Sequence, residues 1–161
     1  MRVYLIGLPG SGKTRIGKKL AQKLNQEFLD LDQEITKVYG KTPTEIINEE
    51  GEENFRLLES KILKETIDFD GVISTGGGIV TVSENKHFMS GVVVYLEISP
   101  ENIKLTEDEI KSRPILEEKG FFKLFMEREC SYLSFSDIII TIDHKDDEDI
   151  IQEIIKKLWK Y

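Results

Sequence analysis

Five short apolar runs recur along the chain, each followed by a stretch with helical periodicity. We expect the runs at residues 3–7, 28–30, 71–75, 92–98 and 137–142 to be strands. Two of them, VVVYLEI and DIIITI, are almost continuously apolar, which is typical of parallel strands covered on both faces. Alternating strands and helices predict a three-layer, doubly wound α/β domain with a five-stranded parallel sheet. Ligands of such domains bind beyond the carboxyl ends of the strands.

Between the runs, apolar residues return every three or four positions, which predicts amphipathic helices. Thr42, Pro43 and Glu45 indicate a helix start, with an N-cap threonine, a proline in the first turn and a glutamate completing a capping box. Three apolar stripes mark helix faces that we expect to be buried: Ile16, Leu20 and Leu24; Phe55, Leu58 and Ile62; Ile150, Ile151, Ile154, Ile155 and Leu158.

Length and composition narrow the class of protein. A chain of 161 residues without repeat or linker predicts one domain, residues 1–161. The net charge of −8, with no basic stripe, argues against nucleic-acid binding. No apolar run approaches the ~20 residues of a membrane span, so we expect no membrane association. A single cysteine, Cys130, and a start that leads directly into a strand favour the cytoplasm. No exposed apolar stripe stands out, so we expect a monomer.

The stretch GLPGSGKT at residues 7–14 carries the clearest chemistry. It matches G-x-x-x-x-G-K-[ST], and it has the strand before it and the helix after it that this phosphate-binding motif requires. Backbone N–H groups of the glycine-rich loop converge on phosphate oxygens, Lys13 reaches the β- and γ-phosphates, and the hydroxyl of Thr14 ligates Mg²⁺. An accidental glycine turn would not require these flanks. The motif therefore predicts binding of ATP or GTP.

Two carboxylates lie in the stretch FLDLD, which ends the second strand. Asp30 and Asp32 are two positions apart, and we expect them to share one face of the strand end. One can serve the water shell of Mg²⁺, and the other can hold an acceptor hydroxyl or take its proton. An ordinary pair of turn aspartates remains the alternative.

Arginines and glycines suggest what the acceptor is. The chain has 22 basic residues but only five arginines, and Arg56, Arg113 and Arg128 are kept where a planar fork can bind carboxylate or phosphate. Arg56 lies beside an apolar helix stripe, where an ion pair with Glu52 or Glu59 is the alternative role. The triple glycine at 76–78 follows the third strand and suggests close approach of a ligand to the backbone.

Taken together, the motifs resemble those of the shikimate kinases, a branch of the nucleoside-monophosphate-kinase-like P-loop proteins. The matching pieces, in order, are GLPGSGKT, FLDLD, GEENFRLLE, STGGGIV, RPIL and RECSY. The resemblance implies a P-loop kinase fold with a shikimate-binding helical segment at about 33–62 and a mobile lid at about 102–117. It also implies ATP-dependent phosphorylation of the 3-hydroxyl of shikimate, a step towards chorismate and aromatic amino acids.

The resemblance further implies a role for each matching residue. Asp32 would hold the shikimate hydroxyls and act as the candidate base, while Arg56 and Arg128 would grip the carboxylate. Arg113 would close the lid onto the phosphates, and Asp30 would join Thr14 near Mg²⁺. The implied nucleotide-binding residues are Gly10, Ser11, Gly12, Lys13, Thr14, Arg15 and Arg113, and the backbone of Gly76, Gly77 and Gly78 would assist acceptor binding.

The predicted lid departs from the family pattern. Many members carry an arginine before RPIL that stacks on adenine, whereas the stretch ENIKLTEDEIKS has none, and Lys104 is its nearest cation. Other interpretations also stay open. A gluconate or nucleotide kinase of the same architecture is one, and a non-catalytic nucleotide-binding regulator is another.

Overall fold

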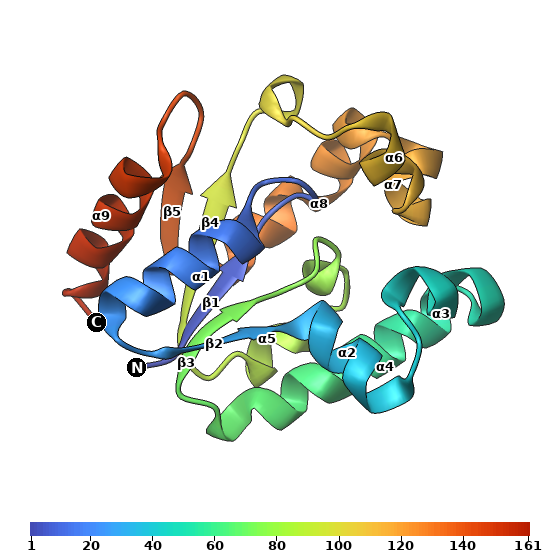
Figure 1. Ribbon diagram of the computed structural model, residues 1–161, viewed down its shortest axis with the longest axis horizontal. Helices are drawn as coiled ribbons and strands as arrows, with labels where there is room; N and C mark the ends of the chain where they lie inside the picture. Colours follow the sequence, from blue (N-terminus) through green and yellow to red (C-terminus); the bar gives the residue numbers. More distant parts are fainter.

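The computed structural model describes all 161 residues, and its central layer is a sheet of five parallel strands (Figure 1). Neighbouring strands follow the order β2-β3-β1-β4-β5, and every adjacent pair is parallel. The strands are β1 (Val3–Ile6), β2 (Glu27–Asp30), β3 (Gly71–Ser74), β4 (Val92–Glu97) and β5 (Ile138–Thr141). All five predicted runs are confirmed as strands, and the predicted α/β class with them.

Nine α-helices and three short 3₁₀ helices surround the sheet. None of the helices has the length and apolarity that crossing a bilayer requires. The α-helices are α1 (Lys13–Leu24), α2 (Leu31–Tyr39), α3 (Pro43–Glu50), α4 (Glu52–Glu65), α5 (Asn85–Phe88), α6 (Glu107–Lys111), α7 (Pro114–Lys119), α8 (Phe121–Phe135) and α9 (Asp147–Leu158). The 3₁₀ helices are η1 (Thr66–Asp68), η2 (Ile79–Thr81) and η3 (Pro100–Asn102).

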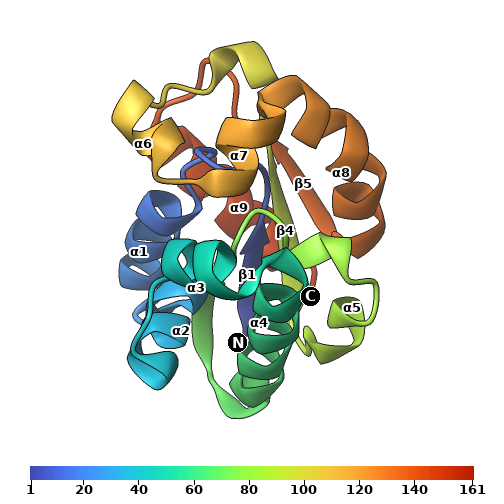
Figure 2. The same ribbon diagram turned by 90° about the vertical axis from the view of Figure 1, so that its right-hand side faces the viewer.

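The sheet separates two cores, because successive residues of a strand point to opposite faces. On one face, Val3 and Leu5 of β1 pack with the apolar stripes of α1 and α9. On the other, Tyr4 and Ile6 pack with α2, α4 and α8. Figures 1 and 2 show these helices on either side of the strands. Strands at the centre of the sheet are therefore covered by helices on both faces, which explains their near-continuous apolar runs.

Strand β5 is an exception to the expectation that both faces are covered. It lies at the edge of the sheet, and Ile139 is 40% exposed, while Ile138 and Ile140 on the same strand are buried. The apolar run DIIITI therefore overstated the burial of this strand, because Ile138 and Ile140 pack into the core beside α9, whereas Ile139 points to the other face, which is only partly covered.

Local sequence explains where the helices of the predicted acceptor segment begin. Thr42 accepts a hydrogen bond from the backbone N–H of Glu45, whose side chain bonds back to the N–H of Thr42, and Pro43 fills the first position of α3. The predicted capping box is confirmed. Helices α2, α3 and α4 thus fold into a unit beside the sheet, facing α6 and α7 across its carboxyl edge (Figure 2).

Candidate active site

A cavity of about 1080 Å³ opens at the carboxyl ends of the strands. Its wall is formed by the phosphate-binding loop, by α2, α3 and α4, by the loop after β3, by the segment around α6 and α7, and by α8. A volume of this size accommodates small-molecule ligands. The structure brings most of the residues singled out from the sequence to this wall: Gly10, Gly12, Lys13, Thr14, Arg15, Asp32, Arg56, Gly76, Gly77, Gly78, Arg113 and Arg128. Ser11 and Asp30 lie behind it.

The phosphate-binding loop is held by its own polar groups. Gly12 caps α1 with a φ of 88°, a left-handed conformation that glycine adopts without strain. The ammonium of Lys13 is buried and donates to the carbonyl oxygens of Gly7 at 2.8 Å and Leu8 at 2.9 Å. Burial lowers the pKa of Lys13 to about 7, against the opposing effect of the Asp32 carboxylate. The amino group of Lys13 therefore lies where the motif places phosphate, and the negative charge of a bound phosphate favours its protonated form.

Asp30 connects this loop to the acceptor segment. The hydroxyl of Thr14 donates to Oδ2 of Asp30 at 2.7 Å. The other oxygen of Asp30 accepts from the backbone N–H groups of Asp32 and Gln33 and so caps α2. The expectation that Asp30 and Asp32 share a strand face is wrong, because β2 ends at Asp30 and Asp32 already belongs to the first turn of α2.

Asp32 lies close to other acidic groups. Burial raises its pKa to about 6, and the nearby carboxylates of Glu59 and Asp30 add to the rise, while Lys13 and Arg56 oppose it. The carboxyl is therefore a base whose pKa lies near neutral pH, which suits proton transfer.

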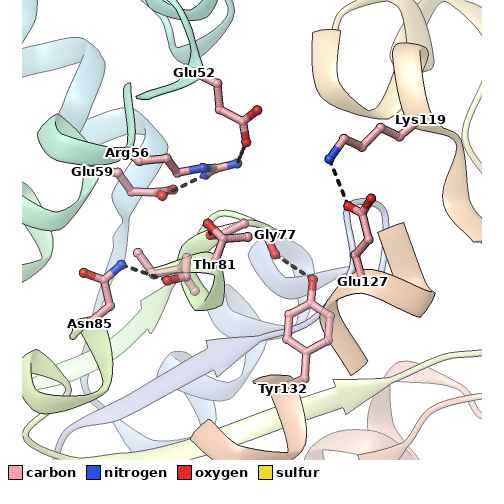
Figure 3. A network of polar contacts seen from close by, with 11 residues as sticks. Glu52, Arg56, Glu59, Gly77, Thr81, Asn85, Lys119, Glu127 and Tyr132 are labelled. Carbon is pink, nitrogen blue, oxygen red and sulfur yellow. Dashed lines mark hydrogen bonds and ion pairs between the residues drawn. The ribbon is translucent and has the colours of Figure 1, made fainter. Parts of the chain in front are cut away.

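Arg56 lies beside the buried face of α4, as expected, with a side chain only 11% exposed. One terminal nitrogen donates to Glu59 at 2.8 Å and the other to Glu52 at 3.4 Å (Figure 3). Both suggested ion-pair partners are therefore in place. Nε of Arg56 and Oε2 of Glu59 nevertheless have no partner, so the pair leaves polar atoms at the cavity unsatisfied.

Arg128 has no carboxylate within salt-bridge distance, although Glu59 and the hydroxyl of Tyr132 are nearby. It lies on α8, is 4% exposed, forms no salt bridge, and its Nε has no hydrogen-bond partner. A buried cation without a counter-ion carries a large desolvation cost. Its position on the cavity wall therefore favours an anionic ligand.

The triple glycine follows β3 and is crowded by side chains of the protein itself. A Cβ atom on Gly78 would overlap the guanidinium of Arg56, and one on Gly77 would lie 2.8 Å from Pro9. None of the three has a positive φ. The glycines are therefore needed for space rather than for an unusual backbone conformation. Tyr132 donates to the carbonyl of Gly77 at 2.6 Å (Figure 3). This tyrosine ends the matching piece RECSY, but the sequence motifs assigned it no role.

The segment at 102–117 covers the phosphate-binding loop. A capping box at Thr106 and Glu109 starts α6, and the guanidinium of Arg113 donates to the Glu109 carbonyl at 2.6 Å. The segment is polar and acidic in composition, but apolar side chains still anchor it. Four of its apolar side chains are partly buried against the larger core: Ile103, Leu105, Ile110 and Ile115.

One hydrogen bond joins this segment to the acceptor side. The hydroxyl of Thr44, at the start of α3, donates to the carbonyl of Ser112 at 2.6 Å.

Arg15 forms an ion pair on the other side of the phosphate-binding loop, where its Nε lies 3.0 Å from the carboxylate of Asp147 at the start of α9. Arg15 therefore links the phosphate-binding loop to α9 while still lining the cavity.

Known proteins are similar to this chain in sequence and in structure. A shikimate kinase from Wigglesworthia glossinidia brevipalpis is 36% identical over 98% of this chain and 96% of its own length. A solved structure of shikimate kinase from Acinetobacter baumannii in complex with shikimate covers 99% of this chain, with 93% of that chain covered, at 34% identity and a TM-score of 0.90. A shikimate kinase from Aquifex aeolicus covers 99% of this chain and 96% of its own at 35% identity and a TM-score of 0.82. The shikimate kinase family model matches residues 9–159. This chain belongs to the shikimate kinase family.

Proposed function

We propose that this protein transfers the γ-phosphoryl group of ATP to the 3-hydroxyl of shikimate, giving shikimate 3-phosphate and ADP. The observation that carries the proposal is Arg128, a buried cation without a counter-ion on the wall of a cavity that also contains a phosphate-binding loop. Such a site favours an acceptor molecule with a negatively charged group that pairs with Arg128. Shikimate carries both a carboxylate and hydroxyl groups, and family membership supports it as the acceptor.

On the nucleotide side, the loop at Gly10–Lys13 and the N-terminus of α1 bind the phosphates, and the ammonium of Lys13 moves from the loop carbonyls to phosphate oxygens. Thr14 and Asp30 fit a Mg²⁺ ion, because their oxygens lie 2.7 Å apart and hard oxygen ligands beside a nucleotide are what this ion prefers. When bound, Mg²⁺ neutralises charge on the phosphate oxygens.

On the acceptor side, the forks of Arg56 and Arg128 hold the carboxylate, assisted by the N–H groups of Gly76–Gly78. The carboxylate of Asp32, ionised at neutral pH, accepts the hydrogen bond of the acceptor hydroxyl and takes its proton during transfer. The residues together orient the hydroxyl towards the phosphate-binding loop, and orientation is the main requirement of phosphoryl transfer.

Residues 102–117 act as a lid in this proposal. Closing them over both substrates excludes water that would compete for the γ-phosphoryl group, and brings Arg113 to the phosphates. We further propose that the protein works as a monomer in the cytoplasm and takes part in aromatic amino acid biosynthesis. The single cysteine supports the cytoplasm, the net charge of −8 supports a monomer, and family membership supports the place in biosynthesis.

The test is an ADP-release assay with ATP and Mg²⁺ in which the acceptor is shikimate, gluconate or a nucleoside monophosphate. We expect turnover with shikimate and only background with the others, and loss of turnover when the ion is chelated. Turnover with gluconate or a nucleotide, and none with shikimate, would assign the protein to another kinase class. ADP release with no acceptor would leave only a nucleotide-binding or hydrolysing protein.

A further inference from the structure

Tyr132 lies directly behind the glycine loop and outside the cavity wall. It is fully buried on α8, one helical turn after Arg128. Its ring stacks on Tyr95 of β4, with 4.9 Å between the ring centroids and 21° between the planes. Its hydroxyl donates to the carbonyl oxygen of Gly77 at 2.6 Å, and Figure 3 shows it meeting the loop from the side opposite Arg56. Burial raises the pKa of Tyr132 to about 12, so the hydroxyl remains a donor at neutral pH.

The carbonyl groups of the glycine loop all have donors within the chain. Gly76 accepts from the backbone N–H of Ile79, Gly78 accepts from the N–H and the hydroxyl of Thr81, and Gly77 accepts from Tyr132. The N–H groups of the same three residues donate to no acceptor in the chain. The loop is therefore polarised, with its carbonyls engaged by the protein and its N–H groups free for an anion.

Tyr132 determines the direction of one of these N–H groups. A trans peptide is planar, so its C=O and N–H point in opposite directions. Because the carbonyl of Gly77 is held towards Tyr132, the N–H of Gly78 is directed away from it, towards the side on which Arg56 lies. Glycine has the widest choice of backbone conformations of any residue, so a run of three would not keep this orientation unaided.

We propose that Tyr132 is a positioning residue for the acceptor carboxylate. It touches neither substrate. It acts by fixing the Gly77–Gly78 peptide, so that the free N–H of Gly78 and the guanidinium of Arg56 are directed at the same anion, and its ring stacks on Tyr95 of β4 and so anchors α8, the helix that also carries Arg128. This inference rests on the proposed function, because the carboxylate in question is that of shikimate.

The experiment compares Tyr132→Phe with Tyr95→Phe. Tyr132→Phe keeps the stacked ring and removes the hydroxyl, which holds the loop and also lies beside the guanidinium of Arg128. Tyr95→Phe is the matched control, because the hydroxyl of Tyr95 is buried without any hydrogen-bond partner. Steady-state constants for both substrates are measured for the two variants and the wild type, together with shikimate affinity by calorimetry and melting temperature.

We expect Tyr132→Phe to raise the KM and the dissociation constant of shikimate by about five- to tenfold, the effect of one weakened hydrogen bond to a charged group. The KM of ATP and kcat should stay within about twofold of wild type, and Tyr95→Phe should leave every constant unchanged. An unchanged shikimate KM in Tyr132→Phe would overturn the inference. So would a fall of kcat together with equal changes in both KM values, since a general loss of structure would act in that way.

The wild-type measurement separates this inference from the proposed function. Wild-type protein that fails to phosphorylate shikimate contradicts the proposed function and removes the basis of the inference. Wild-type protein that turns over shikimate, with a Tyr132→Phe variant of equal shikimate affinity, leaves the proposed function intact and overturns only the role of Tyr132.

Discussion

The two halves of the cavity are built in different ways. Most of the nucleotide half comes from one continuous stretch, residues 7–15, and its buried Lys13 finds partners within that stretch, the carbonyls of Gly7 and Leu8. The acceptor half is assembled from α2, α4, the loop after β3 and α8, which are far apart in the sequence. Here buried atoms lack partners: Nε of Arg56, Oε2 of Glu59 and Nε of Arg128.

The difference shows two ways of preparing a site for an anion. In the nucleotide half, a loop and a helix N-terminus direct backbone N–H groups at phosphate, and the buried amino group of Lys13 is held by carbonyl oxygens of the chain itself. In the acceptor half, charged side chains are desolvated before the ligand arrives, and this cost in folding free energy is recovered only on binding. The substitutions below act on one half at a time.

The largest effect should come from Lys13→Ala, which removes the charge of the nucleotide half. Phosphoryl transfer depends on positioning and on stabilising charge, so we expect kcat to fall by ~10²-fold or more. Lys23→Ala on the same helix is the control, because Lys23 forms only an exposed ion pair with Glu148. A Lys13→Ala variant with near-normal turnover and an unchanged melting temperature would exclude this role.

Asp32→Asn should damage the acceptor half and spare the nucleotide half. The amide keeps the shape but loses charge-assisted hydrogen bonds worth about 1.5–3 kcal/mol each, so kcat/KM for shikimate should fall about 10- to 100-fold. The KM of ATP should change little. If ATP affinity collapsed instead, with shikimate affinity unchanged, the roles of Asp30 and Asp32 would be exchanged.

The pH profile gives a second measurement on Asp32. The ionised carboxylate is the active form and its pKa is about 6, so kcat/KM for shikimate should decrease as the pH falls below that value. The slope should approach tenfold per pH unit, about 1.4 kcal/mol. The acid limb should be missing in Asp32→Asn, and its persistence there would assign it to another group.

Arg56→Lys should raise the KM of shikimate by about tenfold, equivalent to about 1.4 kcal/mol. Lysine keeps the charge but lacks the parallel N–H donors that match a carboxylate. It also cannot bind a carboxylate and Glu59 at the same time, as the guanidinium of Arg56 can. Arg2→Lys is the control. Arg2 bonds to Phe69 and Ser90 and precedes β1, so it lies at the end of the sheet opposite the cavity. An unchanged KM of shikimate in Arg56→Lys would show that Arg56 serves only in structural ion pairs with Glu52 and Glu59.

The smallest effect should come from Lys104→Ala. Lys104 is exposed and lines the cavity, whereas Lys111, the other lysine of this segment, does not. An exposed ion pair with phosphate contributes about 0.2–1 kcal/mol, so the KM of ATP should rise by no more than about fivefold. Lys111→Ala should have no effect. Equal changes in the two variants would show that only the net charge of the segment matters.

The contrast between the halves also explains what the sequence could predict. The phosphate-binding loop is a local motif with required flanks, and Lys13 and Thr14 lie where it placed them. Arg56 and Arg128 were found through their residue type and the family pattern. The strand alternation failed at Asp32, because the Asp30 side chain caps a helix that hydrophobic periodicity did not reveal.

Contacts between distant residues were beyond prediction from the sequence. The bond from Tyr132 to Gly77 spans 55 positions, and no periodic pattern records it. The crowding of Gly78 by Arg56 likewise depends on how α4 packs beside the loop after β3. Local periodicity determines which elements form, whereas side-chain partners across the cavity follow from the tertiary arrangement.

The hydrogen bond from Thr44 to the Ser112 carbonyl has a thermodynamic consequence. Thr44 belongs to the segment proposed to carry shikimate, and Ser112 precedes Arg113, which is proposed to reach the nucleotide. Displacing either segment changes this bond, so the two binding equilibria share an energetic term. Reciprocity then applies: whatever factor shikimate adds to the affinity for ATP, ATP adds to the affinity for shikimate.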